Sequence, residues 1–393
     1  MMKVLHTSDW HLGHVLYNYD RREEQQAMLD WMAELVREEQ PDVFLLAGDV
    51  FDSTQPSASV QTLLQEALLK IHEACEDMHI VCIAGNHDSG SKHTIFRSPW
   101  AKMNVVMLGN VSRDLNDYSD YIIKIGEKGY VVAVPYAAER NMPEDFFKNL
   151  GKQVAEQNGN QLPVVLTAHL AVSGSDFRGH ENANDTMVGG LECQGAEIFG
   201  EGYDYVALGH IHKAQYLFGT QRRIRYSGTP VPVSFDEAMG AGEHGVTIVE
   251  LEKHGDLPQF RTIPFLNPRP LVSLPLKGFG EWESVKKEFE AFPDNIPAYI
   301  RLNVLVDGHL PVAANSEASQ IASGKQCRFC LINPKRKVQT CQGDGYHHLT
   351  TTEFQQMTPK EVARMYLETK QEEHADDLLK LFETAMKEVR HED

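Results

Sequence analysis

Residues 43–49 read Val-Phe-Leu-Leu-Ala-Gly-Asp, five apolar residues that end on a glycine and a carboxylate. A continuous apolar run of this length predicts a strand that is buried on both faces. Similar short runs stand at 4–7 and 80–84, and apolar residues at helical spacing over 23–39 and 57–76 lie between the runs. Strands that alternate with helices in this way predict βαβ units and a largely parallel or mixed sheet covered by helices.

The middle of the chain carries more predicted strands and fewer helices. Apolar runs indicate further strands at 121–125, 130–134, 163–169, 205–208, 224–227 and 245–251. So many strands with few helices between them favour an α/β sandwich of two packed sheets over one doubly wound sheet. We therefore expect a first domain over residues 1–263, which ends at a proline-rich linker over 264–270.

Two smaller regions follow the linker. Residues 271–345 predict a small α/β domain, with strands at 271–276, 298–306 and 326–332 and helices at 282–291 and 316–323. Residues 351–393 are polar and predict a helical tail with amphipathic helices at 358–373 and 375–390. These helices carry a surplus of large apolar residues, so they either dock on the small domain or bind a partner in a groove.

The composition excludes some function classes. The 37 Lys and Arg against 56 Asp and Glu give a net charge of −19, which excludes nucleic-acid binding mainly through a basic surface. Bound divalent metals or a basic partner could still serve a nucleic-acid enzyme. No apolar run approaches the roughly 18 residues that span a bilayer, and the first residues lack the apolar region of a signal peptide. With six cysteines, we expect a reduced cytoplasmic protein that binds no membrane.

Polar clusters follow five of the predicted strands. They are Asp9-Trp10-His11, Gly48-Asp49, Gly85-Asn86-His87-Asp88, His169, and Gly209-His210-Ile211-His212. Ligands of open α/β sheets bind beyond the carboxyl ends of the strands, where loops can bring all five clusters together. In extended backbone, Asp9 and His11 would face the same side because they are two residues apart.

Asp, His and Asn without Cys suit Mn, Fe or Zn. A lone Gly-Asp is usually a turn, and a lone histidine such as His169 is more often a buried core residue. Five compatible clusters at five strand ends are hard to obtain by chance, so the sequence predicts a dinuclear metal site. Two metal ions at such a site can activate a water and stabilise the leaving oxygen of phosphoester hydrolysis.

The order Asp-x-His, Gly-Asp, Gly-Asn-His-Asp, His and Gly-His-x-His resembles the calcineurin-like metallophosphoesterase superfamily. Residues 6–13 (HTSDWHLG), 47–52 (AGDVFD) and 226–237 (YSGTPVPVSFDE) look like the bacterial SbcD family of nuclease subunits. The resemblance is strong to about residue 237 and loose after 264. It implies a sandwich of two mixed sheets flanked by helices, with a small α/β capping domain and a C-terminal helical tail.

The resemblance also implies site roles, by matching motif positions. Asp9, His11 and His212 would hold one metal, Asn86, His169 and His210 the second, and Asp49 would bridge both. His87 would bind no metal and would act as the catalytic acid on the leaving oxygen. The ions would be Mn²⁺. Asp52 stands where some archaeal and eukaryotic relatives carry a second functional histidine, and we expect it to orient a metal ligand.

The implied function is two-metal hydrolysis of DNA phosphodiester bonds, as exonuclease on duplex ends and endonuclease on single strands and hairpins. The family acts in DNA repair, replication and recombination. The resemblance implies an SbcC-like coiled-coil ATPase as partner and a homodimer of this subunit within a heterotetramer. Two alternatives stay open: a stand-alone metallophosphoesterase of small phosphoesters or cyclic nucleotides, and a metal-bound scaffold without catalysis.

Several weaker signals are given less weight. Cys327 and Cys330, with Cys341 downstream, could suggest zinc, but in a strand residues i and i+3 face opposite sides of the sheet. The basic triplet 335–337 is either a solvated turn or a contact to DNA phosphate. His14, Tyr17 and residues 21–22 are either groups at the substrate rim or a solvated helix start. No Gly-Lys-Ser/Thr follows Gly90, so we expect no ATP hydrolysis by this chain itself.

Overall fold

The computed structural model describes residues 1–337 without 113–117, 139–140, 178–192 and 238–243, and in addition residues 363–364, 367 and 378–382. The chain divides into two compact units, Met1–Lys337 and Val338–Asp393. The predicted tail helices lie outside the described residues apart from those last short pieces, which are helical. Among the described residues, no helix has both the length and the apolar character that crossing a membrane would need.

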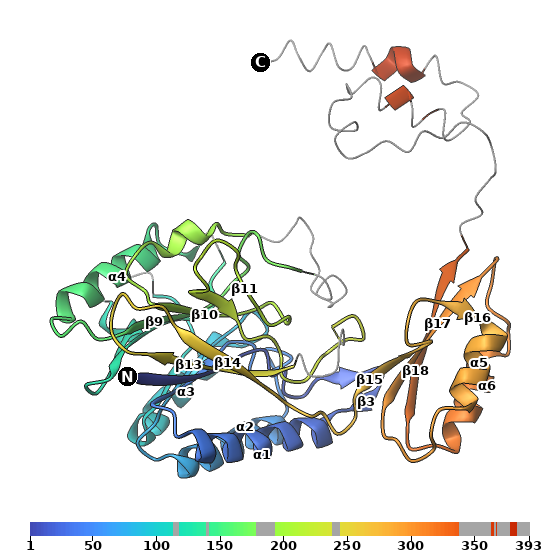
Figure 1. Ribbon diagram of the computed structural model, residues 1–393, viewed down its shortest axis with the longest axis horizontal. Coiled ribbons are helices and arrows are strands. Elements are labelled where there is room, and N and C mark those ends of the chain that lie inside the picture. Colours follow the sequence, from blue (N-terminus) through green and yellow to red (C-terminus); the bar gives the residue numbers. More distant parts are fainter. Residues whose placement is uncertain are drawn as a thin grey trace. The chain divides into compact units, whose positions relative to one another are not determined.

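Two six-stranded mixed sheets build a sandwich in the first unit, as the sequence predicted (Figure 1). The first sheet has the order β14-β13-β1-β4-β5-β6. Its strands are β1 (Met2–Thr7), β4 (Val43–Ala47), β5 (His79–Ile83), β6 (Val105–Leu108), β13 (Gly245–Leu251) and β14 (Gln259–Pro264). Strands β1, β4, β5 and β6 are parallel, and β13 and β14 are antiparallel to their neighbours.

The second sheet has the order β11-β12-β10-β9-β8-β7. Its strands are β7 (Ile122–Ile125), β8 (Gly129–Val134), β9 (Val164–His169), β10 (Tyr205–Gly209), β11 (Gln215–Tyr216) and β12 (Ile224–Tyr226). Strands β8, β9, β10 and β12 are parallel, so their carboxyl ends lie at one edge of the sheet. The antiparallel strands β7 and β11 close the two sides.

Alternating side chains of the central strands separate two cores. Phe44 and Leu46 pack with the buried faces of α1 (Arg22–Glu39) and α2 (Ala58–Ala74), which cover the outer face of the first sheet (Figure 1). Val43 and Leu45 pack instead against the second sheet, in the core between the layers. Buried polar contacts also join the two sheets: His6 Nδ1 lies 2.9 Å from the Tyr205 hydroxyl, and Arg225 Nε–H donates to the Thr247 hydroxyl at 3.0 Å.

Some elements were not predicted. They are α3 (Gly90–Trp100), β6, α4 (Phe146–Gln157), β11, β14 and β16 (Gly280–Glu281), together with the hairpin β2 (Val15–Leu16) and β3 (Tyr19–Asp20) and the short 3₁₀ turns Ala101–Met103, Ser119–Tyr121 and Ala196–Phe199. Helix α3 begins with a glycine and contains Pro99, so its sequence is a poor helix former. Helix α4 covers the second sheet with Phe146, Phe147 and Leu150 (Figure 1).

A smaller four-stranded parallel sheet follows the linker. It contains β15 (Leu271–Leu274), β16 (Gly280–Glu281), β17 (Tyr299–Val306) and β18 (Arg328–Arg336), with helices α5 (Trp282–Glu290) and α6 (Ala314–Ser323). The predicted elements are present with shifted ends. The basic triplet lies at the end of β18 and not in a turn, and Lys337 pairs with Glu281 and Asp307. We call residues 271–337 the small sheet region.

Cys327 and Cys330 pack in different places, as the strand spacing predicted. Cys327 is buried in the core of the small sheet region, whereas Cys330 contacts the cluster around Tyr299. Both thiols are free, and neither belongs to a group of residues that could hold a metal among the described residues. Cys341 lies outside the described residues.

Candidate metal centre

All the predicted ligands come together where strands of both sheets end. Asp9 and His11 follow β1, Asp49 follows β4 and Asn86 follows β5, while His169 ends β9 and His210 and His212 follow β10. Ligand atoms within 4.8 Å of one another form three groups: Asp9, His11 and His212; His11, Asp49 and His87; and Asp49, His169 and His210. The strand-end clusters therefore meet as expected.

Asp49 lies between two sets of imidazoles. Its Oδ2 is 3.3 Å from Nε2 of His169 and 3.8 Å from Nε2 of His11. On one side, Nε2 of His11 lies 3.1 Å from Nε2 of His212. On the other side, Asn86 Oδ1 lies 2.9 Å from His169 Nε2 and 3.0 Å from His210 Nδ1. Lone pairs that converge in this way fit cations on both sides of Asp49.

The backbone at these residues is not extended, so the reason given for Asp9 and His11 facing one side was wrong. Strand β1 ends at Thr7, and Asp9, His11 and Asp49 have φ of 54°, 44° and 49°. His210 has φ of 102°. Left-handed backbone at residues other than glycine costs free energy and persists where the surrounding structure holds it, as it does at many functional sites. Sharp turns, and not strand alternation, aim these side chains inward.

Glycines let the ligand loops approach one another. A Cβ on Gly85 would lie 2.1 Å from Asp49 Oδ1, and a Cβ on Gly48, at φ of 88°, would lie 2.3 Å from His169 Nδ1. Both distances are far shorter than atoms allow. These two glycines are therefore required by the packing of the centre itself.

Buried hydrogen bonds fix the loops and the ring tautomers. Asp88, for which the sequence predicted no role, accepts hydrogen bonds from the backbone N–H groups of Val50, Phe51 and Gly85 and so joins two ligand loops. His169 Nδ1–H donates to the Ala47 carbonyl at 2.8 Å. That bond leaves Nε2 of His169 to face Asp49.

The ionisable groups of the centre shift one another's pKa. Burial alone would raise the pKa of Asp49, but His169 and His11 hold that pKa well below its usual value. Burial alone would lower the pKa of His169 and His212, but Asp49 and Glu237 respectively raise each pKa to about 9. Asp49 is therefore ionised at neutral pH, and a cation that binds the imidazoles of His169 and His212 must displace protons.

His87 lies beside the ligands and is half-buried. Its backbone N–H donates to Asp49 Oδ1 at 2.9 Å, and its ring lies edge-on to His11 with centroids 4.9 Å apart. Its Nδ1 lies 3.1 Å from the Asp52 carbonyl oxygen. Because His87 groups with His11 and Asp49, its position is also compatible with binding a metal ion. The prediction that His87 binds no metal therefore needs a direct test.

Asp52 and Glu237 stand behind two of the predicted ligand histidines. Asp52 Oδ1 is 3.4 Å from His11 Nδ1, where the sequence placed an orienting carboxylate. Glu237, quoted only as part of a motif, accepts a 2.8 Å hydrogen bond from His212 Nδ1–H. The two residues are 25 positions apart in the chain, and nothing in their spacing indicates that they meet.

The residues that the sequence suggested for the substrate rim differ in how exposed they are. Arg21 is 1% exposed and donates to the Pro232 carbonyl, so it is neither a rim group nor a solvated helix start. Tyr17 is 46% exposed. His14 is half-buried, and burial lowers its pKa to about 4.

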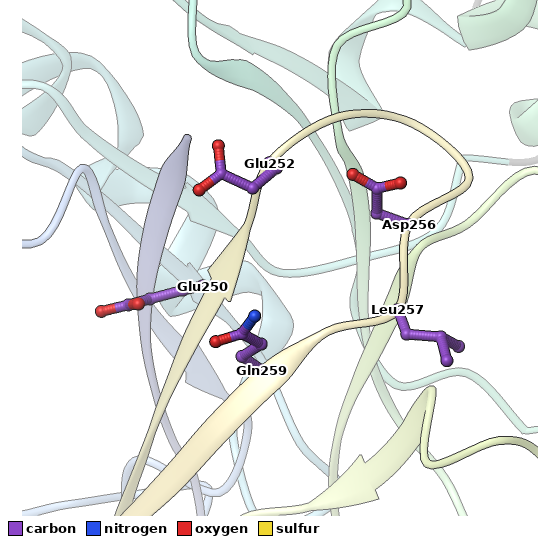
Figure 2. A pocket seen from close by; sticks show the side chains of 5 residues that line it. All are labelled: Glu250, Glu252, Asp256, Leu257 and Gln259. Carbon is purple, nitrogen blue, oxygen red and sulfur yellow. The ribbon is translucent and has the colours of Figure 1, made fainter.

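A separate surface pocket lies at β13, β14 and the turn between them (Figure 2). Its lining is Glu250, Glu252, Asp256, Leu257 and Gln259. Three carboxylates would repel a phosphate, and the pocket contains none of the predicted ligands. It is therefore not the catalytic site.

Comparison with known proteins defines the class. The calcineurin-like phosphoesterase family matches residues 2–214. The SbcD subunit of the SbcCD nuclease of Rhodobacter capsulatus is 31% identical over 309 residues, which cover 70% of this chain and 72% of that protein. The proteins of the same name are 28% identical over 335 residues in Escherichia coli K12 (79% of each chain) and 30% identical over 287 residues in Bacillus subtilis 168 (69% and 71%).

The chain belongs to the calcineurin-like phosphoesterase family. Its fold is the two-sheet α/β sandwich of that family, as predicted. With that membership, the His and Asp groups that meet around Asp49 form a site for two metal ions.

Proposed function

We propose that this chain is the nuclease subunit of an SbcCD-type complex and hydrolyses DNA phosphodiester bonds with two bound metal ions. The observation that carries the proposal is the buried cluster around Asp49, at the strand ends of a chain whose relatives over 69–79% of its length are named as SbcCD nuclease subunits. The activities would be exonuclease action on duplex ends and endonuclease action on single strands and hairpins. Repair, replication and recombination of DNA are the processes that need them.

In this proposal Asp9, His11 and His212 hold one ion, and Asn86, His169 and His210 hold the other. Asp49 bridges the two, which its place between the imidazole sets supports. When bound, two divalent ions, which we take to be Mn²⁺, supply an activated water and charge stabilisation at the phosphate. Their identity as Mn²⁺ rests on the family resemblance.

His87 then acts as the general acid. With Nδ1–H donated to the Asp52 carbonyl, Nε2 carries the proton that the leaving oxygen receives. A histidine suits this task because its ordinary pKa lies close to neutral pH. Asp88 keeps the Gly85–His87 turn against the Asp49 loop and so holds the acid beside the scissile bond.

The proposed assembly rests on the family resemblance, and the charge of the chain fits it. A chain of net charge −19 gains little from phosphate contacts of its own, which suits a partner that supplies part of the affinity for DNA. We assign this role to an SbcC-like coiled-coil ATPase, bound to a homodimer of this subunit in a cytoplasmic heterotetramer. Residues 1–263 form the nuclease domain, 271–345 the small capping domain and 351–393 the segment that binds the partner.

The deciding experiment is a nuclease assay on hairpin and linear duplex DNA, with and without the coexpressed ATPase, in Mn²⁺ and in Mg²⁺. We expect Mn²⁺-dependent cleavage of single strands by the chain alone and ATP-stimulated processing of duplex ends by the complex. Cleavage of small phosphodiesters without cleavage of DNA would overturn the proposal. The stand-alone phosphoesterase alternative is not favoured, because the relatives that match over this length are nuclease subunits by name.

Truncation after Gln342 tests the partner segment. It should leave the metal centre and cleavage of single-stranded DNA intact and abolish copurification with the ATPase. Stoichiometric copurification of the shortened chain would place the partner surface elsewhere, and an insoluble product would favour docking of the tail on the small domain.

A further inference from the structure

The ligand histidines differ in what stands behind them. His212 Nδ1–H donates to Glu237 Oε1 at 2.8 Å, and His11 Nδ1 lies 3.4 Å from Asp52 Oδ1. His169 Nδ1–H donates to a neutral backbone carbonyl, that of Ala47. Carboxylates therefore support both histidines of the Asp9 half, while a peptide oxygen supports His169 in the other half.

Glu237 is held rigidly for this role. Its side chain is 3% exposed, and its second oxygen accepts the Val233 N–H at 2.9 Å. The loop before it is fixed by buried Arg21, which donates to the Pro232 carbonyl. A carboxylate fixed on both oxygens cannot turn away from His212, so its charge remains directed at the ring.

The contact at His11 is looser. A distance of 3.4 Å is long for a hydrogen bond, and no described residue forms a well-aligned hydrogen bond with the buried His11 Nδ1. The Asp52 side chain is also more exposed than that of Glu237, at 34%. Solvent partly screens the charge of Asp52, so we expect it to affect the basicity of the His11 ring less than Glu237 affects that of His212.

A carboxylate behind a ligating imidazole orients the ring, makes the inward nitrogen more basic and adds negative charge near the ion. We propose that Glu237, assisted by Asp52, makes the Asp9–His11–His212 half the tighter of the two metal sites, so that it fills first. The inference rests on the two-metal assignment proposed above. Glu237 and Asp52 act through the histidines and are positioning residues.

The test is titration of the metal-free full chain with Mn²⁺ in the absence of DNA, followed by electron paramagnetic resonance of free and bound Mn²⁺. The wild type should bind two ions in two steps, the first mononuclear and the second spin-coupled to it. In Glu237→Gln the amide oxygen still accepts from His212 but the charge is gone. We expect the tight step to weaken about 10–100-fold and the weaker step to change by less than about threefold.

Single-site backgrounds assign each step to a half of the centre. His169→Ala should retain one tightly bound ion, and adding Glu237→Gln should weaken it. His212→Ala should retain one weakly bound ion, and adding Glu237→Gln should not change the affinity for that ion. Glu250→Gln is the matched control, because it removes the same charge from the acidic surface pocket on β13. Circular dichroism confirms that each variant is folded.

The outcomes separate this inference from the proposal on which it rests. Equal weakening of both steps by Glu237→Gln, or an effect no larger than that of Glu250→Gln, would overturn the loading order while leaving two metals in place. A wild-type chain that binds fewer than two ions would overturn the two-metal assignment and the loading order together. Asp52→Asn should act in the same direction as Glu237→Gln and more weakly.

Discussion

The sandwich and the small sheet region are both built on parallel strands, yet among the described residues the groups that could hold a metal ion lie only in the sandwich. Strands of the sandwich end in sharp turns, where Asp9, His11 and Asp49 have left-handed backbone. In the small sheet region, every described residue other than glycine has negative φ, and the strands enclose an apolar core around Phe289 and Ile300. The carboxyl edge of a parallel sheet is a place where ligands can bind, and the turns that end the strands decide whether a binding site forms there.

The largest effect should come from the residue shared by both halves of the centre. Asp49→Asn is expected to reduce nuclease activity to background, because one substitution weakens the binding of two ions. Metal content measured by mass spectrometry should fall together with activity. A variant that still carries about two ions per chain would show that Asp49 does not bridge them.

Next in size is the proposed acid. His87→Gln should retain both metals and DNA binding but lose about 10²–10⁴-fold in turnover, because it removes a proton donor. The same metal analysis serves as the control. Loss of an ion would show that His87 is a ligand, as its grouping with His11 and Asp49 allows. A fall in turnover of less than about tenfold would show that another group protonates the leaving oxygen.

A core substitution in the small sheet region should affect stability and not chemistry. Phe289→Ala empties a fully buried site and should cost about 3–5 kcal/mol of local stability. Hydrogen exchange at α5 and β17 should accelerate, with metal content per folded chain unchanged. Loss of metal in this variant would contradict the separation of the two regions.

The smallest effect is expected at the cysteines. Cys330→Ala should change neither the zinc content of the purified chain nor its Mn²⁺-dependent cleavage, since Cys327 and Cys330 pack in different clusters. Cys75→Ala, at a half-buried thiol in the sandwich, provides the matched control. Stoichiometric zinc that disappears with Cys330 would make the small sheet region a second metal site.

The fold and the meeting of the strand-end clusters were predictable because each left a local signal. Apolar runs that end on Gly-Asp or Gly-His mark both the strand and the turn that follows it. Helix α4 also carries a local signal, the apolar residues Phe146, Phe147 and Leu150, although it was not predicted. Helix α3 carries little signal, because residues such as Gly90 and Pro99 are poor helix formers and its order comes from packing.

The partners behind the ligands could not be predicted in the same way. Glu237 reaches His212, and Asp88 reaches Val50, across long stretches of chain. Burial of Arg21 depends on a carbonyl at residue 232, which no periodicity reveals. Such pairs are decided by tertiary packing, which periodicity and spacing do not encode.

The centre also joins the two sheets, which packing and a few hydrogen bonds otherwise hold together. Asp9 and Asp49 follow strands of the first sheet, whereas His169 and His212 belong to the second. Each ion would therefore act as a cross-link between the sheets, at the edge beyond the His6–Tyr205 contact. At a free-ion concentration of about 100 times Kd, one such cross-link adds about 2.7 kcal/mol to the free energy of unfolding. A chelator would then loosen the architecture as well as stop catalysis, and the melting temperature would report metal occupancy.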